Sequence, residues 1–156
     1  MKRLATLMLA FGFGFCLTAN AMAENATKEE CVAKCKEAAL MVKKDKDAGI
    51  AEINKKDGKF AWKDSYVFLM DTNGKMLAHP MSPALLEKAS VMDLTDKNPE
   101  KPKQIFAEFA DIAKSKGEGW SDYMWPKPGE EKPSLKQTYI MKVEGTNMLV
   151  GAGIYK

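Results

Sequence analysis

Ligand-binding chemistry in this chain of 156 residues would centre on its only histidine and the aromatic side chains around it. His79 ends an alternating apolar stretch just before Pro80, and alternation places it on the strand side that carries Phe68 and Tyr66. An unperturbed histidine titrates near about pH 6.5, so binding that used His79 would depend on pH. A histidine that only packs in the core is the alternative, and spacing alone favours it.

A second group of aromatic residues lies in the stretch "GWSDYMWPKPG", residues 119–129. Alternation along a strand puts Tyr123 and Trp125 on one side, with Trp120 and Met124 on the other. Ligand pockets are mostly apolar with a few orienting polar groups, and tyrosine and tryptophan supply both a flat wall and a donor. We therefore predict Tyr123 and Trp125 as pocket residues and Trp120 as core packed against a helix.

Two cysteines, Cys31 and Cys35, could instead carry redox or metal chemistry. Their helical spacing separates the Cβ atoms by about 5–6 Å, whereas a disulfide needs about 3.5–4.5 Å. A bond between them would require a distorted first turn; two buried thiols, a disulfide to a second copy and a metal site are the alternatives. The 11 methionines form no Met-x-x-Met cluster, which favours core packing. A periplasmic metal or redox protein using these cysteines is thus the second functional hypothesis.

The composition indicates one globular domain without enzymatic machinery. The chain is 46% hydrophobic and 29% charged, with 24 basic and 21 acidic residues, so no basic face for nucleic acid is expected. A single histidine, no Gly-x-Ser-x-Gly and no evident carboxylate pair argue against catalysis. No Cys-x-x-Cys-His occurs either, and no cofactor or metal is predicted.

The first residues have the pattern of a secretory signal peptide. A basic "MKR", the apolar "LATLMLAFGFGFCLTA" and the small-residue signal "AMA" predict cleavage after residue 23. The apolar run is shorter than the roughly 20 residues of a membrane span, which argues against the alternative of an uncleaved anchor. We expect residues 1–23 to be the signal peptide and residues 24–156 to be one periplasmic domain.

Hydrophobic periodicity then predicts the order of the elements. The capping-box sequence Thr27-Lys28-Glu29-Glu30 begins one long helix that runs to Asp57-Gly58. One stripe of this helix carries Cys31, Cys35, Ala38, Val42, Gly49 and Ile53.

A hairpin follows, with strands at residues 65–71 and 75–80 around Asn73-Gly74. In that register Met70 faces Leu77, and Phe68 faces His79. A short helix from Ser82-Pro83 to about residue 88, a second at 103–117 and strands at 120–125, 137–143 and 148–155 complete the chain. Both faces of this sheet are apolar, so helices or loops must cover both.

The stretches "FLMDTNGKMLAHP", "DLTD", "KGEGW", "DYMWPKPG" and "YIMKVEGTNMLVGAGIY" together resemble the single Cache domain family of extracytoplasmic sensors, which is related in shape to PAS domains. The resemblance implies an α+β fold: a long N-terminal helix packed on a five-stranded antiparallel sheet, with two short helices between strands 2 and 3. It also implies a small-molecule pocket on the sheet. Members sense small organic molecules, short carboxylates often among them, as outer parts of chemoreceptors or histidine kinases.

The resemblance also implies roles for single residues. His79 matches the "AHP" motif and would donate to a bound carboxylate or orient a pocket wall, and Tyr139 matches the aromatic on its strand. Lys142, on the opposite face from Tyr139, is an alternative cation, although exposed lysines are commoner. Gly151 and Gly153 leave room for either ligand or close helix packing. The expected ligand-binding residues are His79, Tyr123, Trp125, Tyr139, Phe68 and Tyr66.

The expected function is periplasmic binding or sensing of a small molecule, such as acetate or another short carboxylate. The chain ends at Lys156, directly after its last strand, so we expect no transmembrane or effector region of its own. A membrane sensor or transporter would then be the partner, or the gene product lacks an effector. The sequence leaves the ligand's identity and the oligomeric state open.

Overall fold

The computed structural model describes residues 25–156, so the predicted signal peptide lies outside the described part. The helices are α1 (Lys28–Lys44), α2 (Lys46–Ile53), α3 (Pro83–Leu86) and α4 (Ile105–Ser115); the strands are β1 (Ala61–Trp62), β2 (Ser65–Asp71), β3 (Met76–Ala78), β4 (Glu118–Pro126), β5 (Pro133–Lys142) and β6 (Met148–Tyr155). The antiparallel sheet has the order β1-β2-β6-β5-β4, with β3 also paired to β2. The predicted α+β class is confirmed, with β1 as an additional short strand.

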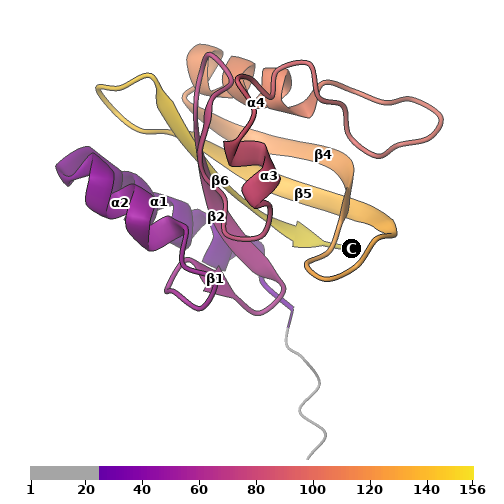
Figure 1. Ribbon diagram of the computed structural model, residues 1–156, viewed down its shortest axis with the longest axis horizontal. Helices are drawn as coiled ribbons and strands as arrows, with labels where there is room; N and C mark the ends of the chain where they lie inside the picture. Colours follow the sequence, from indigo (N-terminus) through magenta and orange to yellow (C-terminus); the bar gives the residue numbers. More distant parts are fainter. Residues whose placement is uncertain (1–24) are drawn as a thin grey trace, which may run out of the picture.

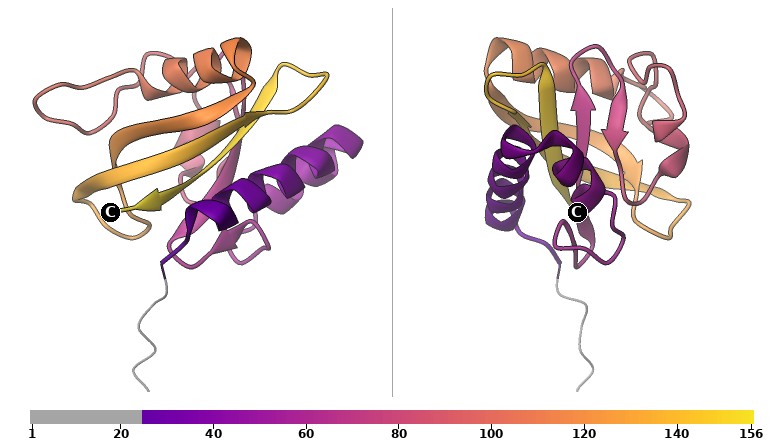
Figure 2. Two further views of the ribbon diagram at one scale, coloured as in Figure 1. Left: turned by 180° about the vertical axis from the view of Figure 1, so that it is seen from behind. Right: turned by 60° about the vertical axis from the view of Figure 1, so that its left-hand side comes forward.

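The molecule has three layers, with the sheet in the middle (Figure 1). Helices α1 and α2 cover one face, which we call the back, and α3, α4 and the connecting loops lie on the other, the front (Figure 2). Each face has its own buried core. The prediction that both faces are covered is therefore confirmed. Within residues 25–156, no helix has the length and apolarity that a membrane span requires.

The N-terminal helix is interrupted, contrary to the prediction of one continuous helix. The capping box at its start is present: Thr27 Oγ1 accepts from the Glu30 N–H, and a Glu30 carboxylate oxygen accepts from the Thr27 N–H. Asp45 then ends α1 in an extended backbone conformation and caps α2, because its carboxylate accepts from the Ala48 N–H at 3.0 Å. The predicted small-residue stripe is nevertheless buried on the back face along both helices.

The β2–β3 hairpin contains a bulge that shifts the predicted register. Leu69 pairs with Ala78 and Met70 with Met76, so the expected pairing of Met70 with Leu77 is wrong. The physical cause lies in the turn, where the Asp71 carboxylate accepts the N–H groups of Asn73 and Lys75 and makes the turn compact. Strand β3 consequently ends at Ala78, before His79.

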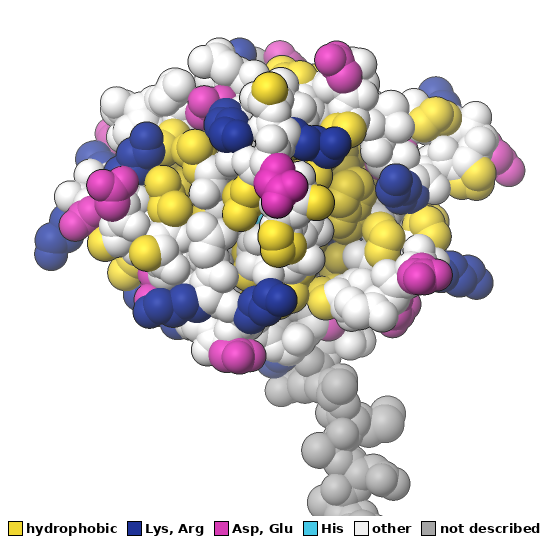
Figure 3. Space-filling view, in the orientation of Figure 1, with side chains coloured by type: hydrophobic (Ala, Val, Ile, Leu, Met, Phe, Trp, Pro, Cys, Tyr) yellow, Lys and Arg dark blue, Asp and Glu magenta, His cyan; other side chains and the backbone are white. Residues whose placement is uncertain are grey.

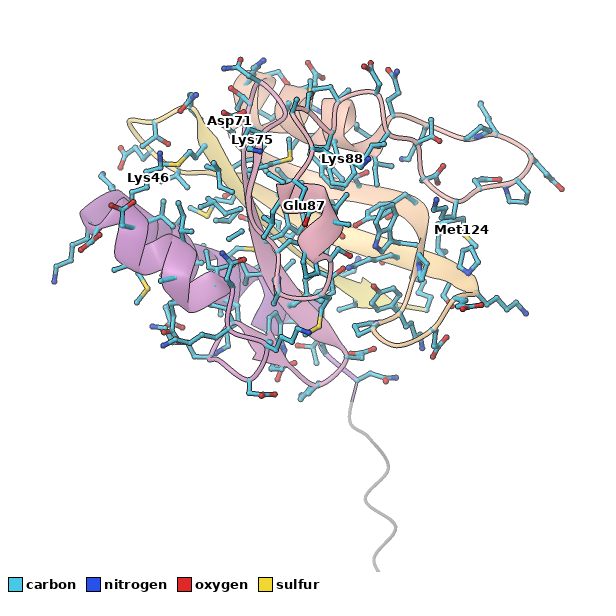
Figure 4. All side chains as sticks on the ribbon, in the orientation of Figure 1. Lys46, Asp71, Lys75, Glu87, Lys88 and Met124 are labelled. Carbon is cyan, nitrogen blue, oxygen red and sulfur yellow. The ribbon has the colours of Figure 1, made fainter. Side chains whose placement is uncertain are left out.

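A lysine of this hairpin holds α3 in place. Lys75 Nζ donates to the carbonyl oxygens of Leu86 at 2.8 Å and Lys88 at 2.9 Å, and Figure 4 shows Asp71 and Lys75 together at the hairpin. A cation at the C-terminal end of a helix satisfies carbonyl groups that lack helical partners. This contact fixes the C-terminal end of α3 against the hairpin.

Candidate ligand-binding site

The front core joins the aromatic residues of β2 and β4 through the ring of His79 and through α4. The His79 ring centroid lies 4.9 Å from that of Tyr66 and 6.1 Å from that of Phe68. On α4, the Phe109 ring is 5.7 Å from Phe68 and 5.4 Å from Tyr123. The structure thus gathers four predicted site residues on one face of the sheet.

Trp125 belongs to the same group, but Tyr139 does not. The Trp125 ring lies 6.2 Å from that of Tyr123 on the front face. Tyr139 points to the back, where its ring is 5.4 Å from Trp120 and its hydroxyl donates to Glu118 at 2.7 Å. The expectation that Tyr139 shares one pocket with the other five residues is therefore not met, because strand alternation turns it toward α1.

The front core also contains a buried cation, Lys136 of β5. Its side chain is only 1% exposed, and Nζ donates to the Tyr66 hydroxyl at 3.1 Å. The same Nζ lies 4.2 Å from the ring centroid of Tyr66 and 4.6 Å from that of Tyr155. Among the ion pairs of residues 25–156, none includes Lys136. A buried ammonium group is normally paired with an acid, so this cation lacks its expected counter-ion.

The strand register explains how the fold accommodates this lysine. Lys136 lies opposite Tyr123 on β4 and Tyr155 on β6, and its Nζ lies over the rings of Tyr66 and Tyr155. Its aliphatic chain crosses Gly153, where an added Cβ would come within 2.8 Å of Lys136 Cε. The same Cβ would come within 2.3 Å of Thr138 Oγ1 and 2.7 Å of the Gln137 carbonyl oxygen, so the room at Gly153 is taken by β5 rather than by a ligand or a helix.

Sequence reasoning missed Lys136 because it began the last-but-one strand at Gln137. Strand β5 in fact begins at Pro133. Extending the alternation backward from Ile140 through Thr138 would have placed Lys136 on the face of Tyr123 and Trp125. The alternative cation, Lys142, is exposed at the end of β5.

His79 is held as a neutral donor. Its Nδ1 accepts from the Ser82 N–H at 2.9 Å, so the ring proton resides on Nε2. Burial and the positive charge of Lys136 lower the pKa of His79 to about 3. The expectation that binding through His79 would vary with pH near neutrality is thus wrong for this environment, because the imidazole stays uncharged throughout that range.

Tyrosine hydroxyls supply the remaining polar groups of the front core. The Tyr123 hydroxyl shares a 2.8 Å hydrogen bond with Thr138 Oγ1, and the Tyr155 hydroxyl donates to the Pro126 carbonyl at 2.9 Å. Burial raises the pKa of both tyrosines. Both phenols therefore remain protonated, and their hydroxyls pair with uncharged oxygen atoms rather than with a carboxylate.

A cavity of about 300 Å³ opens beside this core. Figure 3 shows a hollow with hydrophobic walls next to α3. Tyr66 forms the inner wall, with Lys136 directly behind its hydroxyl. The lining residues are Tyr66, Met81, Ser82, Lys97, Trp125, Pro126, Lys127, Pro128, Gly129 and Glu130. The two prolines of the stretch at 119–129 thus lie at the edge of a cavity rather than in the core.

The cysteines form no site on the back face. Cys31 and Cys35 are separate, fully buried thiols on regular turns of α1, so the structure has no disulfide between them. Burial raises the pKa of Cys31 to about 11 and also raises the pKa of Cys35 well above its ordinary value. Within residues 25–156, no three His, Cys, Asp or Glu side chains converge as a metal ion would need.

Comparison with solved structures finds the same fold. A Cache chemosensory domain described for carboxylic acid recognition superimposes with a TM-score of 0.70 at 23% identity, covering 81% of this chain and 91% of that one. A methyl-accepting chemotaxis protein from Vibrio parahaemolyticus gives 0.66 at 23% identity, covering 82% and 87%. A periplasmic sensor domain of a chemotaxis protein gives 0.63 at 22% identity, covering 81% and 88%.

Sequence relatives are large signalling proteins. The chain is 30% identical over 92 residues to the methyl-accepting chemotaxis protein McpP of Pseudomonas putida, and 30% identical over 93 residues to the sensor histidine kinase MctS of Rhizobium johnstonii. These matches cover 59% and 60% of this chain but only 16% and 19% of the relatives, so the chain spans less than a fifth of their length. The family model described as Cache domain matches residues 42–156. The chain belongs to the Cache domain family.

Proposed function

We propose that this domain senses a small organic carboxylate, which binds at the Tyr66 wall of the front cavity and supplies the missing counter-ion of Lys136. The observation that carries the proposal is the buried Lys136 ammonium without an acidic partner among the described residues. An uncompensated buried charge is costly. A carboxylate that approaches Tyr66 from the cavity would offset part of that cost.

The neighbouring groups suit a carboxylate rather than a cation or a neutral polar molecule. Tyr66 can donate its hydroxyl proton outward while it accepts from Lys136, which strengthens the bond it gives. Charge-assisted bonds of this kind are about twice as strong as neutral ones. Neutral His79 packs its ring 4.9 Å from that of Tyr66 but is buried and does not line the cavity, so it supports the Tyr66 wall. Trp125 and Met81 provide apolar walls for the carbon chain.

The role as a sensor follows the family and its relatives. McpP is a chemotaxis receptor and MctS is a sensor kinase, and one similar structure is described as a periplasmic sensor domain. For this chain we propose a periplasmic location, binding without chemical conversion, and a membrane sensor or transporter as the protein that responds. A metal or redox role for Cys31 and Cys35 has weaker support, because both thiols are buried and protonated.

A ligand comparison tests the proposal. The melting temperature of residues 24–156 is measured with acetate, propionate and butyrate, and with acetamide and propionamide as uncharged counterparts. A ligand at about 100 times its dissociation constant adds roughly 2.7 kcal/mol to the free energy of unfolding. The acids should raise the melting temperature and the amides should not. Equal shifts from acid and amide, or none from any acid, would contradict the proposal.

Tyr66→Phe provides the matched variant. It removes one hydroxyl from the cavity wall and retains the ring that packs against His79. We expect carboxylate affinity to fall about tenfold or more, since a hydrogen bond to a charged group contributes roughly 1.5–3 kcal/mol. Tyr139→Phe, on the back face, removes a hydroxyl of the same kind and should leave affinity unchanged.

A further inference from the structure

The outer end of the cavity carries two more lysines. Lys97 and Lys127 both line it, and neither forms an ion pair with any described residue. Glu130 is the only acidic residue of the lining, and its side chain is exposed. The mouth of the cavity is therefore positive, while the inner wall is backed by the separate charge of Lys136.

The position of Lys127 is defined by a tyrosine that it shares with Lys136. Lys127 Nζ lies 5.9 Å from the Tyr155 ring centroid, and Lys136 Nζ lies 4.6 Å from the same centroid. The two ammonium groups are therefore separated by no more than the sum of these two distances. Half-burial and the contact with Tyr155 restrict the Lys127 side chain. When an anion binds, this lysine therefore loses less side-chain entropy than a free surface lysine would lose.

Lys97 approaches from a different element. Its backbone N–H donates to the Met124 carbonyl at 2.9 Å, which joins the loop before α4 to β4. Met124 marks this part of β4 in Figure 4. The lysine thus comes from a loop that is anchored to the same strand as Trp125. Two cations from separate elements therefore line the same cavity.

Apolar side chains lie between the inner and outer charges. Met81, Trp125, Pro126 and Pro128 contribute to the lining. The cavity volume of about 300 Å³ lies at the lower end of the roughly 300–1,000 Å³ that is typical of small-molecule sites. A ligand that fits the lining has an anion at each end and methylene groups between them.

We infer that the physiological ligand is a short aliphatic dicarboxylate, with one carboxylate at Tyr66 and Lys136 and the other at Lys127 and Lys97. The inference rests on the proposed function, because it uses the same inner carboxylate position. It adds a second anionic group, held at the cavity mouth by Lys127 and Lys97. Monocarboxylates of the same length occupy the inner position alone and bind more weakly.

Succinate and butyrate are the matched probes, since they have the same number of carbons and differ by one terminal carboxylate. Isothermal titration of residues 24–156 should show succinate binding about three- to tenfold more tightly, the range expected for partly exposed ion pairs. The preference should shrink as salt is raised, because the outer pairs are screened. Lys127→Gln and Lys97→Gln should each weaken succinate binding more than butyrate binding and thereby reduce the preference.

The control variant is Lys46→Gln on α2, a lysine that Figure 4 shows on the side of the molecule away from Met124. It should retain the full preference for succinate. Glu130→Gln should increase succinate affinity, because it removes the one acidic side chain of the lining.

Three results separate this inference from the proposed function. If butyrate binds at least as tightly as succinate, the dicarboxylate inference is overturned and the carboxylate function stands. If both lysine variants keep the wild-type preference, the outer carboxylate does not contact them and the inference is likewise overturned. If neither of these acids binds and acetate and propionate do not bind either, the proposed function fails together with the inference.

Discussion

The substitution Lys136→Met separates the functional role of the buried cation from a structural one. Methionine retains an unbranched chain over Gly153 and removes the charge. The variant loses a charge-assisted bond to Tyr66, worth roughly 1.5–3 kcal/mol. It also loses two cation–π contacts, at about 0.5–2 kcal/mol each. Against these losses stands the removal of a desolvation penalty of several kcal/mol for one buried ion.

These opposing contributions nearly cancel in the free protein. We expect the free energy of unfolding of Lys136→Met, measured by urea denaturation without ligand, to lie within about 1 kcal/mol of wild type or above it. Carboxylate affinity should fall about tenfold or more, since the ligand loses its buried counter-ion and the Tyr66 hydroxyl loses the cation that strengthens the bond it donates. The control Lys142→Met changes an exposed lysine of the same strand and should alter both quantities little.

A particular combination of results would refute this reasoning. If Lys136→Met loses more than about 3 kcal/mol of stability yet binds carboxylates as wild type does, the cation is satisfied within the core and serves folding alone. If the variant keeps both its carboxylate affinity and its stability, Lys136 does not contribute to ligand binding. Only lost affinity with preserved stability agrees with a cation whose counter-ion is the ligand.

Three further predictions concern pH, packing and thiol reactivity. The pKa of His79 is about 3 in the folded protein and about 6.5 in the unfolded chain. Between these two pH values the unfolded state binds more protons, so the free energy of unfolding falls as the pH decreases from about 6.5. Measured by urea denaturation, the free energy of unfolding should change by roughly 1 kcal/mol per pH unit between about pH 6 and 4.5, and His79→Gln should remove this dependence. An equal slope in the variant would contradict the assignment of the pH dependence to His79. Gly153→Ala should destabilise the fold by about 1–3 kcal/mol, because the new methyl group meets Thr138 Oγ1 at 2.3 Å and the rigid Gln137 carbonyl at 2.7 Å. It should also weaken carboxylate binding, because the methyl group meets Lys136 Cε at 2.8 Å. Denaturation checks the first effect and titration the second, and unchanged affinity would mean that the lysine need not follow this path. Cys31 and Cys35 should resist a thiol reagent in the native state and react after unfolding, since burial raises both pKa values; rapid native labelling would show that α1 opens.

Strand alternation was the most reliable guide to the site. It placed Tyr123 and Trp125 on the opposite side from Trp120, and the structure agrees. The same rule grouped Tyr139 with Ala152, and this pairing is present on the back face. The period of two follows from backbone geometry and holds wherever a strand is regular. The resemblance suggested Tyr139 as a ligand contact from its position alone, without regard to the face on which that position falls.

The breaks in regular structure were harder to predict because they depend on side chains that compete for the backbone. Asp45 ends one helix and begins the next through its own carboxylate, within a sequence whose hydrophobic stripe continues unbroken. Asp71 binds two N–H groups in the hairpin turn, and a bulge then follows in β3. In both cases the hydrophobic pattern was correct and the local hydrogen bonding changed the path of the chain.

Lys136 escaped prediction for a different reason, one that bears on function. A lysine within a strand is normally assigned to solvent, because burial without a partner is unfavourable. Here a glycine on β6 and tyrosines on β2 and β6 give the side chain a path and an enclosure, and none of them is near it in sequence. Local rules of sequence reading assume that each charge finds its partner within the chain. A charge whose partner is an external ligand violates that assumption, so a residue that is anomalous by folding rules alone becomes the strongest indication of what the cavity binds.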